Sequence, residues 1–581
     1  MATHPAWRGL LSILLLAAAV GASSSSTLAA GKIFIFRNAI RDLEEFRGYA
    51  RIAARLKPYG EVQIDVGVLA DKSWYDVPPG GSPWHEFGTY NASTAKFFPH
   101  PKIAPHIPGA WVAENRKLLL GKAAILREQR LEAAFSGNDT HYLPESFFRE
   151  YPHLRGPRVD HPRRTRRDAF AFCLDQPETQ EMLEWMIAEL IRNVPQIRTI
   201  FAHQNDSGAG LCWARGQYSG PNGPAFCRAR STGERVRTML ETMQRGAAKS
   251  GGAITIRLTG TMAESEEKEF LPILPANTFL SRPWSKRNYP EGDPNIVWTG
   301  TMIADSYPVL GLIDPLRVWT TLEKTLPPEV RTVVISSSQP WYHRAGEPLE
   351  TVQKLVDVIE AFQAGPVSGA QGRAKLLRAL AARWGGQKNA DRLASAFQHV
   401  NQAFQLKQEA VPGFDIGFEG FGAVSSRFLT RPMLIKPDLL SKEEEAYFLP
   451  HVFNIDESAA REDYRDYYGH KMVGPPTRDY APLQQAFDEA LAAARILESM
   501  PDAPEQAWLR RLGIGMRMWV CEVRSINNFY FAQELRERNA AVLAGPVRQP
   551  PGCKPPETPT VGAGTPCSGT SSTTPTSSSR C

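Results

Sequence analysis

The sequence predicts an α/β protein: a (β/α)8 TIM barrel followed by a helical C-terminal domain. Short apolar runs of strand length alternate with amphipathic, helix-length segments across residues 31–365. There are enough of these runs for the eight parallel strands that close such a barrel. After residue 366 only amphipathic helical patterns remain, which predicts the change of architecture.

The predicted strands are rich in Ile, Val, Phe or Leu, and each ends at polar or turn-forming residues. They cover residues 32–36, 62–69, 131–135, 198–202, 253–258, 277–281, 295–300 and 332–336. Most of the segments between them have a helical pattern. Two carry distinct start signals, Pro177 in a first turn and the capping box of Ser231 and Glu234.

An open, doubly wound sheet is the alternative fold for the same alternation. A nucleotide-binding sheet of that type carries a glycine-rich phosphate turn after an early strand, and the sequence has no such turn. The barrel is therefore favoured.

The N-terminal segment predicts export. Arg8 precedes the apolar run of residues 10–20, and the small residues that follow resemble a cleavage site, so residues 1–22 are interpreted as a signal peptide. A membrane anchor is the alternative, but the run is shorter than the roughly 20 residues that a span requires. We expect a secreted or periplasmic protein without a stable membrane anchor after cleavage.

Composition predicts the organisation of the C-terminal part of the chain and argues against nucleic acid as a partner. Residues 366–543 are expected to form the helical domain, and residues 544–581, rich in Pro, Ser and Thr, a disordered tail. The net charge of +6 is small for 581 residues, and no nucleic-acid-binding signature occurs, so no nucleic acid is expected as a partner.

The cysteines and histidines lack the spacings of common metal sites. No CxxC pair and no HExxH occur, so neither a metal nor another cofactor is expected. Cys212 and Cys227 bracket a loop rich in Gly and Pro, and a bond between them would staple it. Three further cysteines, Cys553, Cys567 and Cys581, lie in the tail.

The residues at the carboxyl ends of the strands form the candidate site, because barrel enzymes place their chemistry there. The carboxylate, amide, imidazole, guanidinium and aromatic side chains expected at this mouth are Asn138, Asp139, His141, His203, Asn205, Asp206, Trp213, Arg282, Asp305, Tyr307 and Trp341. Polar groups of these kinds bind sugar hydroxyls, and aromatic rings stack on the apolar face of a sugar. The set predicts a carbohydrate substrate.

Asp206 and Asp305 are the predicted catalytic pair, and the other residues are predicted to bind substrate. Two carboxylates on opposite sides of a glycosidic bond suffice for its hydrolysis. Asp206 stands out because Asn205 precedes it and a glycine-rich turn follows, which lets the backbone approach a ligand closely. The alternatives are loop capping for each aspartate and core packing for Trp213 and Trp341.

The segments "IFAHQNDSGAG" and "NIVWTGTMIADSYPVLG" resemble the barrel of the family 67 α-glucuronidases over residues 120–345. The resemblance implies an inverting glycoside hydrolase with a helical domain after its barrel, acting on glycans that contain uronic acids. Asp305 matches a general-base candidate of the family. Gly208 stands where the family carries its acid, a Glu, and Asp206 matches the Asp two positions before that acid, not the acid itself.

These observations predict an exported glycoside hydrolase that cleaves a polysaccharide or its oligosaccharides. Because Gly208 replaces the family's acid, a barrel that binds carbohydrate without cleaving it is the alternative. An enzyme of another kind, such as a lyase or a metal hydrolase using the same mouth, is a third possibility.

Overall fold

The computed structural model describes part of the chain. The described residues are 32–70, 92–160, 168–205, 208–217, 219–260, 263–283, 296–303, 312–325, 332–336, 349–365, 367, 369–410, 441–443, 480–501 and 506–538. The predicted signal peptide and the predicted tail lie outside them. By their internal contacts, residues 1–532 form one compact unit and residues 533–581 another, so the predicted boundaries at 365 and 543 remain predictions.

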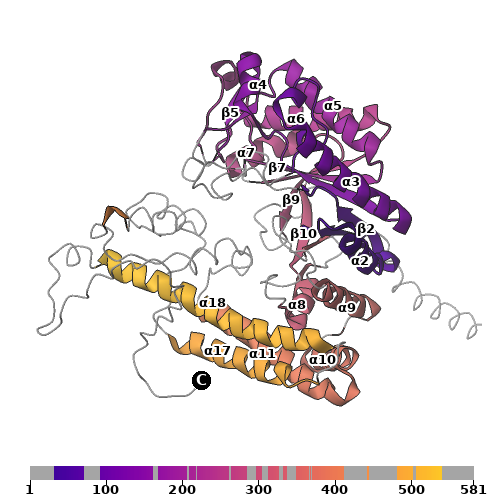
Figure 1. Ribbon diagram of the computed structural model, residues 1–581, viewed down its shortest axis with the longest axis vertical. Coiled ribbons are helices and arrows are strands. Elements are labelled where there is room, and N and C mark those ends of the chain that lie inside the picture. The colour runs from indigo at the N-terminus through magenta and orange to yellow at the C-terminus, as the bar shows by residue number, and fades with distance from the viewer. Residues whose placement is uncertain are drawn as a thin grey trace, which may run out of the picture. The chain divides into compact units, whose positions relative to one another are not determined.

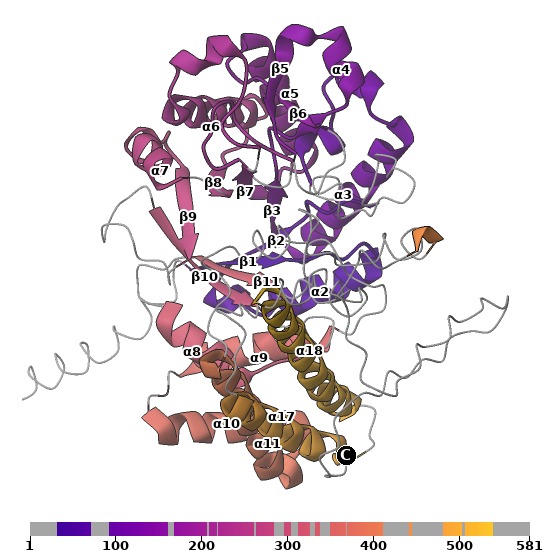
Figure 2. The ribbon, with the colours of Figure 1, turned by 90° about the vertical axis from the view of Figure 1, so that its left-hand side faces the viewer.

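Eight parallel strands form a closed barrel, which confirms the predicted fold class. Around the barrel the strand order is β1-β11-β10-β9-β8-β7-β3-β2. The strands are β1 (Lys32–Arg37), β2 (Gly60–Asp65), β3 (Glu132–Gly137), β7 (Ile197–Gln204), β8 (Thr255–Gly260), β9 (Thr278–Pro283), β10 (Ile296–Ile303) and β11 (Thr332–Ser336). Figure 2 shows β8, β7, β3, β2 and β1 side by side.

The interior of the barrel changes from apolar to polar along the strands. Ile35, Ala134, Phe201 and Val334 form a buried apolar cluster contributed by four strands. Because side chains alternate along a strand, the residues two positions further on share this inward face. In β1, β3 and β7 these are Arg37, Ser136 and His203. The barrel therefore presents a polar layer at the carboxyl ends of its strands.

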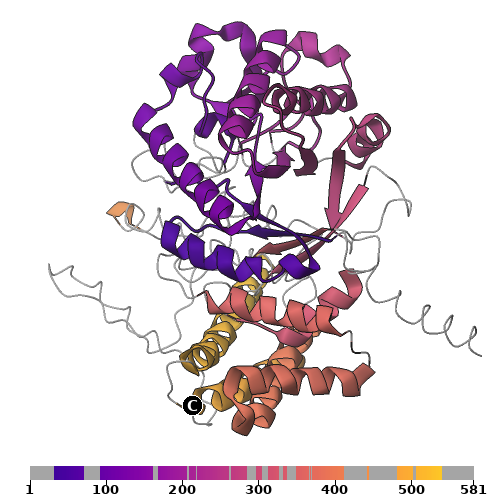
Figure 3. The same ribbon diagram turned by 90° about the vertical axis from the view of Figure 1, so that its right-hand side faces the viewer.

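Helices cover the outside of the barrel, as Figure 3 shows for α2 and α3 in indigo and violet. They are α2 (Leu43–Ala54), α3 (Gly109–Gln129), α5 (Pro177–Asn193), α6 (Thr232–Lys249), α7 (Glu264–Phe270), α8 (Pro315–Thr325) and α9 (Glu350–Ala364). The expected capping box begins α6: the Ser231 hydroxyl accepts from the Glu234 amide, and the Glu234 carboxylate accepts from the Ser231 amide.

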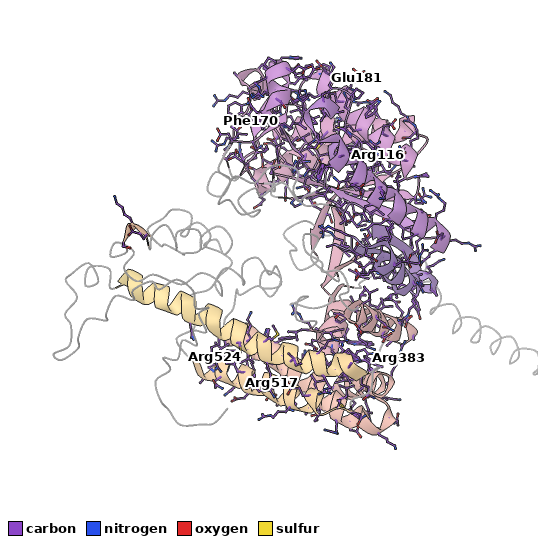
Figure 4. All side chains as sticks on the ribbon, in the orientation of Figure 1. Arg116, Phe170, Glu181, Arg383, Arg517 and Arg524 are labelled. Atoms are coloured by element: carbon purple, nitrogen blue, oxygen red, sulfur yellow. The ribbon has the colours of Figure 1, made fainter. Side chains whose placement is uncertain are left out.

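The connection from β3 to α5 contains a small antiparallel sheet that the sequence did not predict. Its strands, in the order β4-β6-β5, are β4 (Tyr142–Leu143), β5 (Arg155–Arg158) and β6 (Phe170–Phe172), and the short helix α4 (Glu145–Glu150) follows β4. Phe170 of β6 is labelled in Figure 4. These strands are too short, and β5 too poor in apolar residues, to give an alternating pattern.

The helical region after the barrel contains four long helices in the described residues. They are α10 (Gly369–Gly385), α11 (Ala390–Ala410), α17 (Tyr480–Glu498) and α18 (Ala507–Arg538), and Figure 1 shows them running alongside one another. Phe404 and Phe487 each pack against Trp519 of α18. Arg517 (Figure 4) pairs with Glu498 at 2.6 Å. Among the described helices, none is long and apolar enough to cross a membrane.

A buried lysine joins α3 to the carboxyl end of β1. Lys122 is fully buried, and its Nζ donates to Asn38 Oδ1 over 3.1 Å. Burial lowers the pKa of Lys122 from 10.5 to about 7, against the opposing pull of the Asp65 carboxylate. The folded protein therefore releases this proton at a lower pH than the unfolded chain does.

We expect the free energy of unfolding to rise with pH between about 7 and about 10 because of Lys122. In this window the unfolded chain binds one more proton, which gives a slope of up to about 1.4 kcal/mol per pH unit. Urea unfolding of the wild type and Lys122→Met at several pH values measures the difference. Parallel pH profiles for the two proteins would contradict the assignment.

Candidate active site at the barrel mouth

The loops that follow β3 and β7 are joined at the mouth of the barrel. His141 and Ala209 form an isolated antiparallel bridge, and the Tyr142 amide donates to the Gly208 carbonyl over 2.9 Å. The two stretches that the sequence selected, residues 138–142 and 203–213, therefore lie next to each other. Their proximity follows from the adjacency of β3 and β7 in the barrel, although they are separated by about sixty residues of sequence.

Asp139 is a buried carboxyl held by the loop between β2 and α3. Its Oδ1 accepts from the Thr94 amide at 2.9 Å, and its Oδ2 accepts from the Thr94 hydroxyl at 2.7 Å. Burial raises the pKa of Asp139, while the Thr94 bonds and the positive charge of Lys96 oppose that rise. Burial also places the pKa of Lys96 well below 10.5. A buried acid and base with displaced pKa values are typical of functional sites.

Asn138 and His141 flank this carboxyl and are buried with it. The backbone amide of Asn138 donates to the Ala92 carbonyl over 2.8 Å. The His141 ring packs on the Tyr142 ring, with 4.4 Å between the centroids, and Lys96 Nζ lies 6.0 Å from the Tyr142 centroid. The predicted substrate-binding residues after β3 thus form one compact group with Lys96, which the sequence reasoning missed.

The end of β7 supplies a second polar pair. The sequence placed His203 after this strand, but it lies inside β7. The pairing of β7 with β8 continues as far as Gln204 and Gly260. His203 Nδ1 is 3.0 Å from Thr259 Oγ1 on β8. Asn205 follows with φ of 59°, and its Oδ1 accepts from the Leu211 amide at 3.4 Å. Asn205 therefore ties the end of β7 to Leu211, further along the same connection.

Charged residues also end β1 and β2, where the sequence reasoning placed no candidates. Arg37 Nε lies 4.0 Å from Asp65 Oδ2, and Asp65 Oδ1 accepts from the amides of Gly67 and Ser136. These bonds hold the ends of β2 and β3 together. In the sequence Arg37 directly follows the apolar run of residues 32–36, whereas Asp65 lies inside the predicted strand of residues 62–69 and so did not mark a strand end.

Glu267 on α7 is a second carboxyl with a displaced pKa. The pKa of Glu267 is raised to about 7. Burial is the largest cause, and repulsion from the carboxylates of Glu264 and Glu266 adds to it. A carboxyl that titrates near neutrality suits general acid catalysis. In the sequence Glu267 is one of several acidic residues in a row, and the burial of one member cannot be seen in composition.

Trp213 belongs to the packing of the loop between β7 and α6. Its Nε1 donates to the Pro224 carbonyl over 3.0 Å, and its ring contacts a cluster of buried cysteines. The Arg228 guanidinium carbon lies 4.9 Å from the ring centroid. These contacts give Trp213 a structural role, and its role as a sugar platform stays a prediction.

The structure describes little of the remaining predicted residues. Asp206, Asp305, Tyr307 and Trp341 are outside the described residues. Arg282 is described by its backbone alone and lies within β9, whereas the sequence placed it past that strand. The predicted strand ended at Ser281 because a charged Arg282 and then Pro283 follow, although β9 pairs with β10 through Pro283.

Thr94 gives a direct test of how the Asp139 carboxyl is held. We expect Thr94→Val to destabilise the protein by about 1–3 kcal/mol, since it removes a hydroxyl donor from a buried carboxyl. Thr94→Ser keeps the donor and should cost less than half as much. Urea unfolding of the two variants measures the difference, and equal losses would show that the methyl packing matters more than the hydrogen bond.

Comparisons with known proteins identify no family for the chain. No family model matches it, and neither does any curated protein. Solved structures similar to it include a GH138 enzyme targeting pectin rhamnogalacturonan II, with 12% identity and a TM-score of 0.47 over 88% of this chain and 60% of that one. This chain therefore spans about 60% of the length of that enzyme.

Two further solved structures are also glycoside hydrolases. The pneumococcal virulence factor StrH has 12% identity and a TM-score of 0.35, over 65% of this chain and 99% of that one. A GH36 α-galactosidase from Geobacillus stearothermophilus has 10% identity and a TM-score of 0.30, over 58% and 42%. The fold assignment rests on the strand pairing and not on these likenesses, and the family 67 resemblance remains a prediction.

Proposed function

We propose that this protein is a glycoside hydrolase whose active site is the carboxyl-terminal mouth of the barrel. The observation that carries the proposal is the buried polar group at the joined ends of β3 and β7, in which the Asp139 carboxyl lies beside Asn138 and His141. Amides, carboxyls and aromatic rings at one barrel mouth match the requirements of a sugar ring.

In this proposal Asp206 and Asp305 perform the chemistry. Asp206 protonates the leaving glycosidic oxygen as its bond to the anomeric carbon breaks. Asp305 removes a proton from the water that attacks that carbon, so one water is consumed and two hydroxyls form. A separation of about 6.5–9.5 Å between the carboxyls corresponds to inversion, and about 5–5.5 Å to retention with a covalent intermediate.

The substrate and the compartment are further parts of the proposal. The resemblance to the family 67 α-glucuronidases supports a glycan that contains uronic acids, and the N-terminal apolar run supports export. Sequencing the N-terminus of protein recovered from the source culture tests export: a mature chain that begins near residue 23 is expected, and a retained Met1 would contradict it.

An activity screen of the purified protein tests the proposed reaction. We expect saturable release of new reducing ends from at least one member of a panel of aryl glycosides and plant and bacterial polysaccharides, including glucuronic-acid-substituted xylan. NMR of the first product identifies its anomeric configuration and so the stereochemical outcome. Release from neutral glycans alone would reject uronic-acid specificity while supporting hydrolysis.

A barrel that binds carbohydrate without cleaving it is the second candidate. Gly208 occupies the family's acid position with φ of 84°, a conformation that disfavours Glu, and its carbonyl accepts from Tyr142. The local backbone therefore suits glycine better than the catalytic acid of the resembled family. Retention on a polysaccharide affinity gel, combined with no product in the screen, would favour this function over hydrolysis.

A further inference from the structure

Three cysteines that are distant in the sequence meet in one buried cluster beside the barrel mouth. Cys173 follows β6, whereas Cys212 and Cys227 lie in the connection from β7 to α6. The Sγ atoms of Cys173 and Cys227 are 3.1 Å apart, those of Cys173 and Cys212 are 3.7 Å apart, and all three lie within 4.8 Å of one another. A bond between Cys212 and Cys227, which the sequence left open, would thus leave out Cys173, whose sulfur lies near both.

We propose that Cys173, Cys212 and Cys227 form a binding site for a thiophilic d10 cation, Zn²⁺ or Cu⁺. Metal–sulfur bonds of about 2.3 Å place three thiolates roughly 3.8–4.0 Å apart around one cation. The separations of 3.1 and 3.7 Å lie just below this range and the third is no more than 4.8 Å, so small side-chain rotations bring all three sulfurs to bonding distance. Thiolate sulfur selects these soft or borderline cations over Mg²⁺ or Ca²⁺.

A buried arginine beside the cluster holds the three backbone segments that carry the cysteines. Arg235, itself only 1% exposed, donates from Nη1 to the Cys212 carbonyl over 2.9 Å and from Nη2 to the Cys227 carbonyl. Its Nε donates to Asp175 Oδ2 over 2.9 Å, and Asp175 lies two residues after Cys173. One guanidinium therefore ties together all three segments that carry the sulfurs, as supporting residues do at metal sites.

The local charge also favours a metal–thiolate complex. Three thiolates around Zn²⁺ or Cu⁺ leave one or two net negative charges. Arg230 joins Arg235 on the Asp175 carboxylate, with Nη1 at 2.6 Å from Oδ1, so the two arginines and one aspartate contribute a net positive charge. A disulfide would use two sulfurs and leave the third buried thiol alone, whereas one cation engages all three.

Occupancy of this site would fix the loops that form the mouth. Cys173 anchors the small β4-β6-β5 sheet to the β7–α6 connection, and Tyr142 and Ala209 in those two segments belong to the joined strand-end loops described above. The proposal is independent of the reaction that the mouth performs, since it rests on the cysteine cluster and its arginine alone.

Metal titration of the reduced, full-length protein tests the proposal. Cys553, Cys567 and Cys581 are first replaced by Ser so that tail thiols do not bind metal. The protein is reduced, freed of metal by a chelator under nitrogen, and titrated with Zn²⁺ or Cu⁺, with Cd²⁺ as an ultraviolet charge-transfer probe. Elemental analysis after gel filtration is expected to give one metal per chain and an increased Tm. An equimolar mixture identifies which cation is preferred.

Matched variants locate the metal. Cys173→Ser, Cys212→Ser and Cys227→Ser should each weaken binding at least about a hundredfold, whereas Cys521→Ser, at an exposed cysteine on α18, should bind like its parent. Circular dichroism of each metal-free variant checks folding. Equal uptake by the parent and by folded Cys173→Ser would overturn the proposal. A reduced parent that binds neither cation would also overturn it. Peptide mapping of the untreated protein would then be expected to show a disulfide within the cluster.

Discussion

Asp206→Asn and Asp305→Asn are each expected to lower kcat/KM on a cleaved glycoside by a factor of about 10²–10⁴. An amide can neither donate the acid proton to the leaving oxygen nor remove a proton from water, while its shape preserves binding. KM should therefore change far less than kcat. Initial rates of reducing-end formation across a range of substrate concentrations measure both quantities for each variant.

Two controls make this result specific. Asp391→Asn changes an exposed carboxylate that pairs with Arg378 in the helical region, and it should leave kcat unchanged. Glu267→Gln tests the other acid candidate, the carboxyl whose pKa is raised to about 7. Activity that survives both aspartate substitutions but is lost in Glu267→Gln would assign the acid to α7 and reject Asp206.

Arg235→Met is expected to destabilise the barrel by about 3–5 kcal/mol. The substitution leaves the Asp175 carboxylate with Arg230 alone and removes the donors from the Cys212 and Cys227 carbonyls. The loss combines a weakened ion pair on the buried Asp175 with two buried carbonyls left without their donors, each of which costs about 1–3 kcal/mol. Urea unfolding followed by tryptophan fluorescence, in metal-free and reducing buffer, measures the loss.

Arg237 on the same helix provides the control for Arg235. It pairs with Glu241 one turn further on, at 2.7 Å, and its side chain is 53% exposed. Such a surface pair contributes about 0.3–0.5 kcal/mol, so Arg237→Met should change the free energy of unfolding by no more than that. Similar losses for the two variants would show that the buried network does not organise this side of the barrel.

The barrel could be predicted from the sequence because its strands carry their own apolar signal. The run at Thr332–Ser336 matches β11, and Lys32–Phe36 lies within β1. Strand ends were less predictable, since β7 continues through His203 and β9 through Arg282, and both polar residues still pair with neighbouring strands. Their polarity resembled that of a loop.

The candidate site was predictable only where polar residues follow a strand directly. Asn138, Asp139 and His141 were found by that rule, and the structure brings them next to the β7 loop. Lys96 was missed because it lies well into the long β2–α3 connection, far in sequence from the end of the strand before it. The cysteine cluster was missed because its members are too far apart in the chain for a spacing motif to reveal them.

A crystal structure of the protein with an oligosaccharide from its cleaved or bound glycan tests the central claim most directly. The account predicts a sugar ring at the carboxyl ends of β3 and β7, within hydrogen-bonding distance of Asn138, His141 or Asn205, with the carboxyls of Asp206 and Asp305 on opposite sides of a glycosidic oxygen. A sugar bound outside the barrel mouth, with these side chains uninvolved, would contradict it.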